Sequence, residues 1–184
     1  MTYSNFTTEE LVKLLEERDE EIQKLRNKVD EIAIIDETTS LYNKSFLYKA
    51  LGYEMSRAQR SQGYLSVLLF GINNFNAIKE RYGEEITNII LVQIARLLKI
   101  SVRDIDIVGR YGDGEYMLIL PDMNPNNGNV VAERIQRLMD KEIFPVESRV
   151  TLAYGIKSFE GESVNKLINL AETSLNLERK DFNR

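Results

Sequence analysis

The 184-residue chain has the composition of one soluble globular domain with room for an additional segment. It contains 43% hydrophobic and 29% charged residues, with only 3 prolines and 10 glycines. It has no histidine and no cysteine. These absences exclude a Ser-His-Asp triad, a cysteine nucleophile, a disulfide framework and any zinc site built from nitrogen or sulfur ligands. Chemistry must therefore come from carboxylates, lysine, arginine, hydroxyls and the backbone.

The formal net charge of the chain is −5. Residues 1–35 hold five basic and nine acidic groups, so most of the excess negative charge lies in this segment. The remainder is close to neutral, which argues against a nucleic-acid polymer and favours a small ligand or a protein as partner. Residues 1–15 lack a signal-peptide pattern, and no run approaches the roughly 18 apolar residues of a membrane span. We therefore expect a cytoplasmic protein without membrane insertion.

Residues 1–35 carry a heptad pattern, with apolar residues at alternating steps of four and three and one exception at Arg18. The a and d positions are Leu15, Ile22 and Val29, and Leu11, Leu25 and Ile32, respectively. β-Branched residues at a with mostly leucine at d favour a parallel two-stranded coiled coil, in which Glu21 would face Arg26 of the partner. We expect this segment to form a homodimer. The alternative is a single amphipathic helix packed on its own domain.

From Asp36 onward the pattern changes to alternating strands and helices. The continuous apolar run 65–70 is typical of a strand that is buried on both faces. A helix is predicted over residues 74–82 and ends at Gly83. A second, amphipathic helix is predicted over residues 84–100.

Two strand-like runs, 106–110 and 115–120, flank a turn that contains glycine and aspartate, and they predict a β-hairpin. A helix with inward apolar residues at 131, 135 and 138 follows. It is succeeded by an alternating strand over residues 150–156 and a final amphipathic helix over residues 164–180. The order β-α-α-β-β-α-β-α predicts that residues 36–184 form one domain that combines a sheet with helices, of the α/β (α+β) class. Its mixed sheet would be flanked by helices, in an arrangement related to the ferredoxin-like fold.

The hairpin region carries an Arg-x-x-Asp motif, Arg103 to Asp106, followed after five residues by the pentapeptide Gly-Asp-Gly-Glu-Tyr at 112–116. This segment resembles the GGDEF family, the diguanylate cyclases that condense two GTP molecules into cyclic di-GMP. Other stretches agree with the family in order and spacing, namely 36–44, 82–83, 132–135 and 150–156. The resemblance covers residues 36–182. It implies the nucleotidyl-cyclase-like fold of the family and a role in bacterial signalling, and a preceding coiled coil also fits that family.

The sequence departs from the family at its catalytic positions. The resemblance implies acidic side chains that hold a divalent metal at the GTP triphosphate. These two positions fall on Gly71 and Gly114, and the residues that read guanine fall on Lys79 and Asn88. We therefore expect a degenerate, catalytically inactive domain that is not an enzyme, with no cofactor and no bound magnesium.

The inhibitory site of the family is, in contrast, retained. The resemblance places Arg103 and Asp106 in this site, which binds cyclic di-GMP, and adds arginines at Arg134 and Arg57. An arginine donates two hydrogen bonds to guanine O6 and N7 or to a phosphate, and an aspartate accepts from the guanine N1 and N2 hydrogens. The alternative for an Arg-x-x-Asp pair is a surface ion pair worth less than about 1 kcal/mol.

These residues predict a dimeric receptor for cyclic di-GMP that signals to an unidentified protein partner. Two other functions stay open. The first is a structural dimer whose globular part docks a partner without any nucleotide. The second is a residual diguanylate cyclase that uses Asp113 and Glu115 from shifted positions.

Overall fold

The computed structural model describes residues 7–182, and the side chains of residues 7–24 and 33–180 within that range. The chain divides into two compact units between Ile34 and Ile35, and each is described by itself. Within residues 7–182, no helix combines the length and the apolar character needed to cross a lipid bilayer.

The first unit contains one helix, α1 (Thr8–Ile32). Its start is fixed by a capping box, in which the backbone N–H of Thr7 donates to Glu10 at 2.8 Å and the N–H of Glu10 donates to the Thr7 hydroxyl at 3.3 Å. The apolar side chains of Leu15 and Ile22 are 63% and 47% exposed. The heptad positions at Leu25, Val29 and Ile32, with Arg26, lie outside the described side chains. The coiled-coil homodimer stays a prediction.

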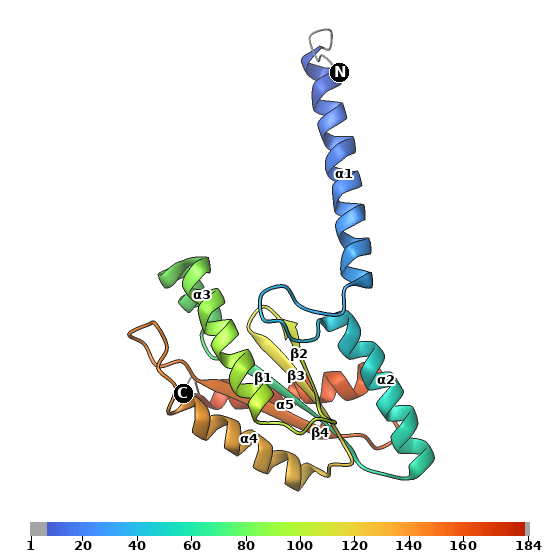
Figure 1. The fold of residues 1–184 in the computed structure, drawn as a ribbon, viewed down its shortest axis with the longest axis vertical. Coiled ribbons are helices and arrows are strands. Elements are labelled where there is room, and N and C mark those ends of the chain that lie inside the picture. Colours follow the sequence, from blue (N-terminus) through green and yellow to red (C-terminus); the bar gives the residue numbers. More distant parts are fainter. Residues whose placement is uncertain (1–6, 183–184) are drawn as a thin grey trace. The chain divides into compact units, whose positions relative to one another are not determined.

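The second unit is a four-stranded sheet between two layers of helices (Figure 1). The strands are β1 (Leu65–Ile72), β2 (Ile107–Gly112), β3 (Glu115–Pro121) and β4 (Leu152–Ser158). The helices are α2 (Lys44–Ser61), α3 (Phe75–Ile100), α4 (Pro125–Met139) and α5 (Val164–Phe182). Helices α3 and α4 cover one face of the sheet, and α2 and α5 cover the other.

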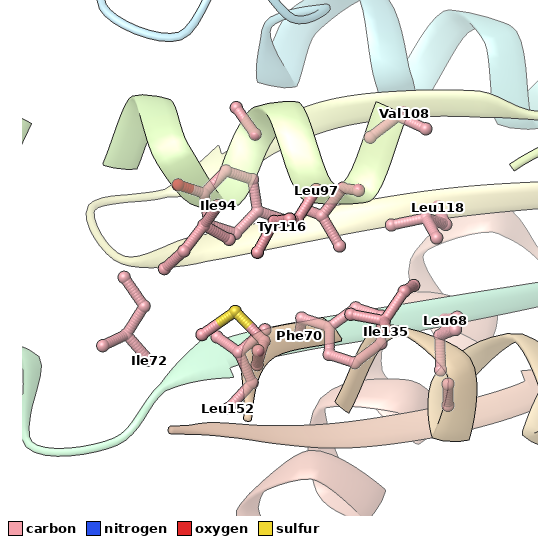
Figure 2. Close-up of a cluster of buried hydrophobic side chains, with 14 of the residues drawn as sticks. Leu68, Phe70, Ile72, Ile94, Leu97, Val108, Tyr116, Leu118, Ile135 and Leu152 are labelled. Atoms are coloured by element: carbon pink, nitrogen blue, oxygen red, sulfur yellow. The ribbon is translucent and has the colours of Figure 1, made fainter. Parts of the chain in front are cut away.

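Strand β1 lies at the centre of the sheet, and all 8 of its residues are buried. Its alternate side chains enter two separate cores, as the strand geometry requires. Figure 2 shows one of these cores, where Phe70 and Ile72 lie near Ile94 of α3 and Ile135 of α4. Leu69 points the other way and packs with α2 and α5. The predicted two-sided burial of this strand is confirmed.

The predicted fold class is confirmed, but the sheet is antiparallel where a mixed sheet was expected. The strand order is β2-β3-β1-β4, and all three neighbouring pairs are antiparallel. Strand β2 runs in the same direction as β1, but the hairpin inserts β3 between them, so the two never pair. In addition to these strand pairs, one isolated bridge joins Tyr42 to Gly109 of β2, and it is parallel.

The two helices expected on either side of Gly83 form one element, α3, with a kink. Gly83 has φ 79° and ψ 175°, so the backbone leaves the helical conformation at this residue. A positive φ of this size suits glycine, which has no Cβ to clash with the carbonyl oxygen. The sequence prediction of a helix break at Gly83 is confirmed.

We expect the packing of α5 on β4 to be intolerant of any added atom at Gly155. A Cβ at this position would lie 2.3 Å from the backbone nitrogen of Leu175 and 2.4 Å from the carbonyl oxygen of Ala171. The substitution Gly155→Ala should therefore lower the free energy of unfolding by about 2–3 kcal/mol, measured by urea denaturation.

The matched control is Gly52→Ala in the middle of α2. A Cβ there would meet its nearest neighbour, Cγ2 of Val164, at an ordinary contact distance of 3.7 Å. This substitution should raise the free energy of unfolding by about 0.5–1 kcal/mol, because alanine loses less backbone entropy in a helix. Equal effects of the two substitutions would contradict the proposed packing.

Candidate functional site

The turn between β2 and β3 is held by an arginine that lies before it. Nη2 of Arg110 donates to the carbonyl of Asp113 at 3.0 Å, and its Nε donates to the carbonyl of Gly112 at 3.2 Å. Its Nη1 also lies 3.4 Å from the carboxylate of Asp36. That carboxylate accepts from both the backbone N–H and the hydroxyl of Thr39. The opening segment of the domain and the hairpin turn are thus fixed to each other.

A pocket of about 610 Å³ lies beside this turn. It is lined by the first turn of α3 (residues 74–77), by Asp113, Gly114 and Glu115 of the hairpin, and by Arg179 near the end of α5. We call it the turn pocket. Its volume falls in the range of small-molecule sites.

Arg179 fills the space beside Gly71, which is the first position where the family resemblance implies a metal-binding carboxylate. A Cβ built on Gly71 would lie 1.9 Å from Nη2 of Arg179, so a side chain at 71 and the guanidinium could not both occupy this place. Nη1 of Arg179 donates to Oε1 of Glu115 at 2.8 Å. Gly71 and Glu115 are direct partners in the register of β1 and β3, which brings the three residues together.

The second implied carboxylate position, Gly114, is closed in a similar way. A Cβ there would lie 2.6 Å from the ring of Phe75, which begins α3. The acidic groups that line the pocket are Asp113 and Glu115, and Glu115 is paired with Arg179. Among the described residues, no group of three or more acidic side chains lies close enough to hold a metal ion. The residues present therefore do not fit the divalent metal that the family resemblance implies.

The residues Arg103 and Asp106 lie together, but they bind each other. Nη2 of Arg103 donates to Oδ1 of Asp106 at 2.7 Å, and the backbone N–H of Arg103 donates to Oδ2 at 2.8 Å. The Asp106 side chain is 1% exposed and that of Arg103 is 44% exposed. The hydrogen bond to Asp106 is the main reason that the pKa of Arg103 is raised, and the charges of Asp106 and Asp122 add to it. Arg103 is therefore a permanently charged, oriented and accessible group.

The two other predicted arginines lie near the same place. Nη2 of Arg134, on α4, donates to the carbonyl of Ser101, two residues before Arg103. Nη2 of Arg57, on α2, donates to Asp122 at 3.0 Å. Asp122 directly follows Pro121, whose carbonyl accepts from Nη2 of Arg103 at 2.8 Å. The structure thus brings arginines from α2, from α4 and from the loop between α3 and β2 near the end of β3, and we call Arg57, Arg103 and Arg134 the arginine cluster.

A hollow of about 320 Å³ adjoins the arginine cluster. It is lined by Arg103 and Asp106 together with Lys99 and Tyr42. Its lining therefore presents two cationic side chains, one aromatic side chain and the carboxylates of Asp104 and Asp106.

The sequence pointed to the arginine cluster but not to Arg179 or Asp122. The Arg-x-x-Asp motif has a fixed position relative to the hairpin, whereas Arg179 reaches the turn pocket only because α5 packs across the sheet. Lys79, at a position that the resemblance assigns to guanine reading, is exposed on α3, and Asn88 is partly buried on the same helix.

The antiparallel sheet, the hairpin turn beside a polar pocket and the preceding Arg-x-x-Asp pair define a GGDEF-type domain. The family model described as "Diguanylate cyclase, GGDEF domain" matches residues 33–184, and the chain belongs to this family.

Two curated relatives illustrate the match. The response regulator PleD of Caulobacter vibrioides is 32% identical over 146 residues, which are 75% of this chain and 32% of PleD. The probable diguanylate cyclase DgcF of Escherichia coli is 30% identical over 169 residues, which are 87% of this chain and 53% of DgcF. The chain therefore spans between about a third and about half of the length of these relatives.

Two solved structures share the fold. The diguanylate cyclase SiaD from Pseudomonas aeruginosa, in complex with its activator SiaC, aligns with a TM-score of 0.77 at 24% identity, over 94% of this chain and 68% of SiaD. The coiled coil and GGDEF domain of DgcB from Caulobacter crescentus, in complex with c-di-GMP, aligns with a TM-score of 0.78 at 17% identity, over 93% of this chain and 95% of that structure.

The prediction that the chain is not an enzyme is contradicted by these comparisons. The matching family model and DgcF are both named for diguanylate cyclases, which points to an enzyme. That expectation rested on Gly71 and Gly114 alone, whereas the turn pocket also contains Arg179, which the sequence did not indicate.

Proposed function

We propose that this GGDEF domain binds cyclic di-GMP at the arginine cluster and passes the signal to a protein partner. The observation that carries the proposal is the convergence of Arg103, Arg57 and Arg134 around the end of β3. Cyclic di-GMP presents two phosphodiester anions and two guanine edges, and arginine is suited to both because its planar fork donates bidentately.

Within this site, Asp106 has a different role from the one that the sequence suggested. The sequence favoured a carboxylate that accepts from guanine N1 and N2. With its side chain 1% exposed and its oxygens bound by Arg103, Asp106 instead holds the guanidinium in position. Arg103, with 44% of its side chain exposed, is the group that contacts the ligand.

Two features of similar proteins support the proposal. The domain of DgcB was solved in complex with c-di-GMP, and SiaD was solved with an activator protein. The first supports a nucleotide ligand for this fold, and the second supports a protein partner.

The experiment is isothermal titration of the full chain with cyclic di-GMP at moderate salt. Arg103→Ala should weaken binding at least tenfold, because a charge-assisted hydrogen bond contributes about 1.5–3 kcal/mol. Asp106→Asn should weaken binding less, because it loosens Arg103 without removing it. Arg81→Ala is the matched control, since Arg81 is an exposed arginine on the first part of α3 that pairs with Glu147.

Two results would contradict the proposal. The first is the absence of heat with the unmodified chain at tens of micromolar ligand, which would favour a structural docking domain without nucleotide. The second is unchanged affinity in Arg103→Ala.

The proposed signalling unit is a homodimer formed through α1. Ile22 occupies an a position of the heptad pattern and is 47% exposed in the single chain. Ile22→Lys should shift the chain to a monomer in sedimentation equilibrium, because a charge would be buried in the apolar contact. Lys13→Ala, at a charged position outside a and d, should leave the dimer intact. A monomeric unmodified chain at micromolar concentration would refute this part of the proposal.

A second candidate function is diguanylate cyclase activity, which the names of the family model and of DgcF favour. The acidic residues in the turn pocket are Asp113 and Glu115. Incubation with GTP and Mg²⁺ or Mn²⁺, followed by chromatography, should then give cyclic di-GMP, and the double variant Asp113→Asn, Glu115→Gln should give less. Product at the level of a protein-free blank would count against this activity.

A further inference from the structure

The two outer edges of the sheet are protected differently. Backbone covers the outer edge of β2, because the N–H of Tyr42 donates to the carbonyl of Val108 at 3.3 Å and the N–H of Arg110 donates to the carbonyl of Tyr42 at 2.8 Å. Among the described residues, no such segment covers the outer edge of β4, the last strand of the sheet (Figure 1). An uncovered strand edge is a template for pairing with another chain.

The register of β4 on β1 shows which of its backbone groups face outward. At one end of the pair, the N–H of Asn73 donates to the carbonyl of Thr151 at 3.0 Å. At the other end, the N–H of Phe159 donates to the carbonyl of Leu65 at 2.9 Å. Alternate residues of an antiparallel strand bond to opposite sides, so every second residue between these two points its N–H and carbonyl away from β1. These residues are Leu152, Tyr154, Ile156 and Ser158.

Side chains, rather than a strand, occupy the first half of this edge. Nε2 of Gln136, on α4, donates to the carbonyl of Leu152 at 3.4 Å. Oε2 of Glu178, on α5, accepts from the N–H of Tyr154 at 2.6 Å. An amide and a carboxylate thus take the place of a neighbouring strand, and both can rotate away from it.

The second half of the edge is open. In the part of the chain that the structure describes, the outward N–H groups of Ile156 and Ser158 have no hydrogen-bond partner. Both residues are partly exposed, and Lys157 between them is exposed, so this part of the strand is accessible. Backbone groups of this kind bind water until another polar group replaces it, and an added strand would supply such groups in register.

The side chains beside the edge carry opposite charges at its two ends. Burial raises the pKa of Tyr154, and the charges of Glu178 and Glu133 raise it further, so this end has a negative potential. Lys157 lies nearer the other end. Because Gly155 packs against α5, the alternation of a strand places Lys157 on the side of α5, from which Glu178 also comes.

A hollow of about 270 Å³ lies at the acidic end of the edge. It is lined by Leu152 and Ala153 of β4, by Glu178, and by the last turn of α4 with Asp140. The C-terminal end of a helix is its negative end and favours a cation. Arg149 also lines the hollow, but it donates to Asp140 at 2.6 Å, which leaves the carboxylate of Glu178 for an incoming basic group.

We propose that the free edge of β4 binds an extended segment of a protein partner as a fifth strand. A basic side chain of this segment enters the hollow beside Glu178, and an acidic side chain about four residues away on the same face lies beside Lys157. Backbone hydrogen bonds provide affinity in this mode of recognition, and the paired charges provide specificity. The inference rests on the proposed function in giving its protein partner a place of contact, but strand binding itself needs no cyclic di-GMP.

The probe is a fluorescent peptide about as long as β4, with alternating threonine and valine and with a lysine and a glutamate four residues apart on one face. A second peptide has glutamate at both charged positions. Fluorescence anisotropy measures the binding of each to the full chain without cyclic di-GMP. The unmodified chain should bind the lysine–glutamate peptide more tightly than the double-glutamate peptide, because Glu178 repels the second glutamate.

Charge reversal at the edge should change this preference. Glu178→Lys should bind the double-glutamate peptide at least about fivefold more tightly than the unmodified chain does. Glu37→Lys is the matched control, because it makes the same change of net charge at an exposed position of the segment that covers the opposite edge of the sheet. It should change neither affinity appreciably. Arg103→Ala should also bind both peptides normally, which separates this surface from the arginine cluster.

Two N-methylated forms of the lysine–glutamate peptide test the strand geometry. Methyl groups on alternate amides block the hydrogen bonds along one edge of the peptide, so the two complementary patterns block opposite edges. Binding should be lost with one pattern and retained with the other.

Three results would overturn the inference. These are no binding of the lysine–glutamate peptide at millimolar concentration, equal effects of the two methylation patterns, and equal effects of Glu178→Lys and Glu37→Lys. Self-association of the Ile22→Lys chain that Glu178→Lys abolishes would assign the edge to a second copy instead. Thermal unfolding of each variant verifies that it is folded. If Glu178→Lys does not fold, Glu178→Gln, which keeps an acceptor for the N–H of Tyr154, should still remove the preference between the two peptides.

Discussion

The two-sided burial of β1 is the constraint on which both candidate sites depend. Because the apolar side chains of this strand alternate between two packed cores, a slip of one residue in its register with β3 would move each of them into the opposite core, where the packing does not accommodate it. That register pairs Gly71 with Glu115 at one end and Leu65 with Pro121 at the other. The turn pocket lies at the first end and the arginine cluster at the second, separated by about 20 Å at roughly 3.3 Å per residue.

Much of the fold could be predicted because its signals are local. A continuous apolar run, a glycine that ends a helix and a turn between two apolar runs each act over a few residues, and each appears where it was expected. The prediction of a mixed sheet was wrong because the neighbours of a strand are set by the whole topology. The sequence shows that β2 and β3 form a hairpin, but not that β3 takes the place next to β1.

The same distinction between local signals and contacts set by the whole fold applies to the candidate sites. The register of the Arg-x-x-Asp motif with the hairpin identified Arg103, and the family alignment suggested Arg134 and Arg57, which the fold brings near it. Arg179 could not be found in this way, because it reaches Gly71 from the last helix of the chain and no spacing records that contact. The sequence therefore showed that the two implied carboxylates are absent from the turn pocket, but not that the guanidinium of Arg179 lies there.

Each of the two sites contains an arginine paired with a carboxylate, and the burial of the carboxylate determines how easily the pair separates. Asp106 is almost fully buried, so separating it from the guanidinium of Arg103 would leave a buried charge with only the backbone N–H of Arg103 as its partner, at a cost of several kcal/mol. Glu115 keeps about a third of its side chain in solvent, so separating it from Arg179 costs far less. The first carboxylate therefore fixes its arginine in place, whereas the second pair separates more readily. Arg103 donates to the carbonyl of Pro121 at one end of β3, and Glu115 lies at the other end, so one strand helps to position both pairs.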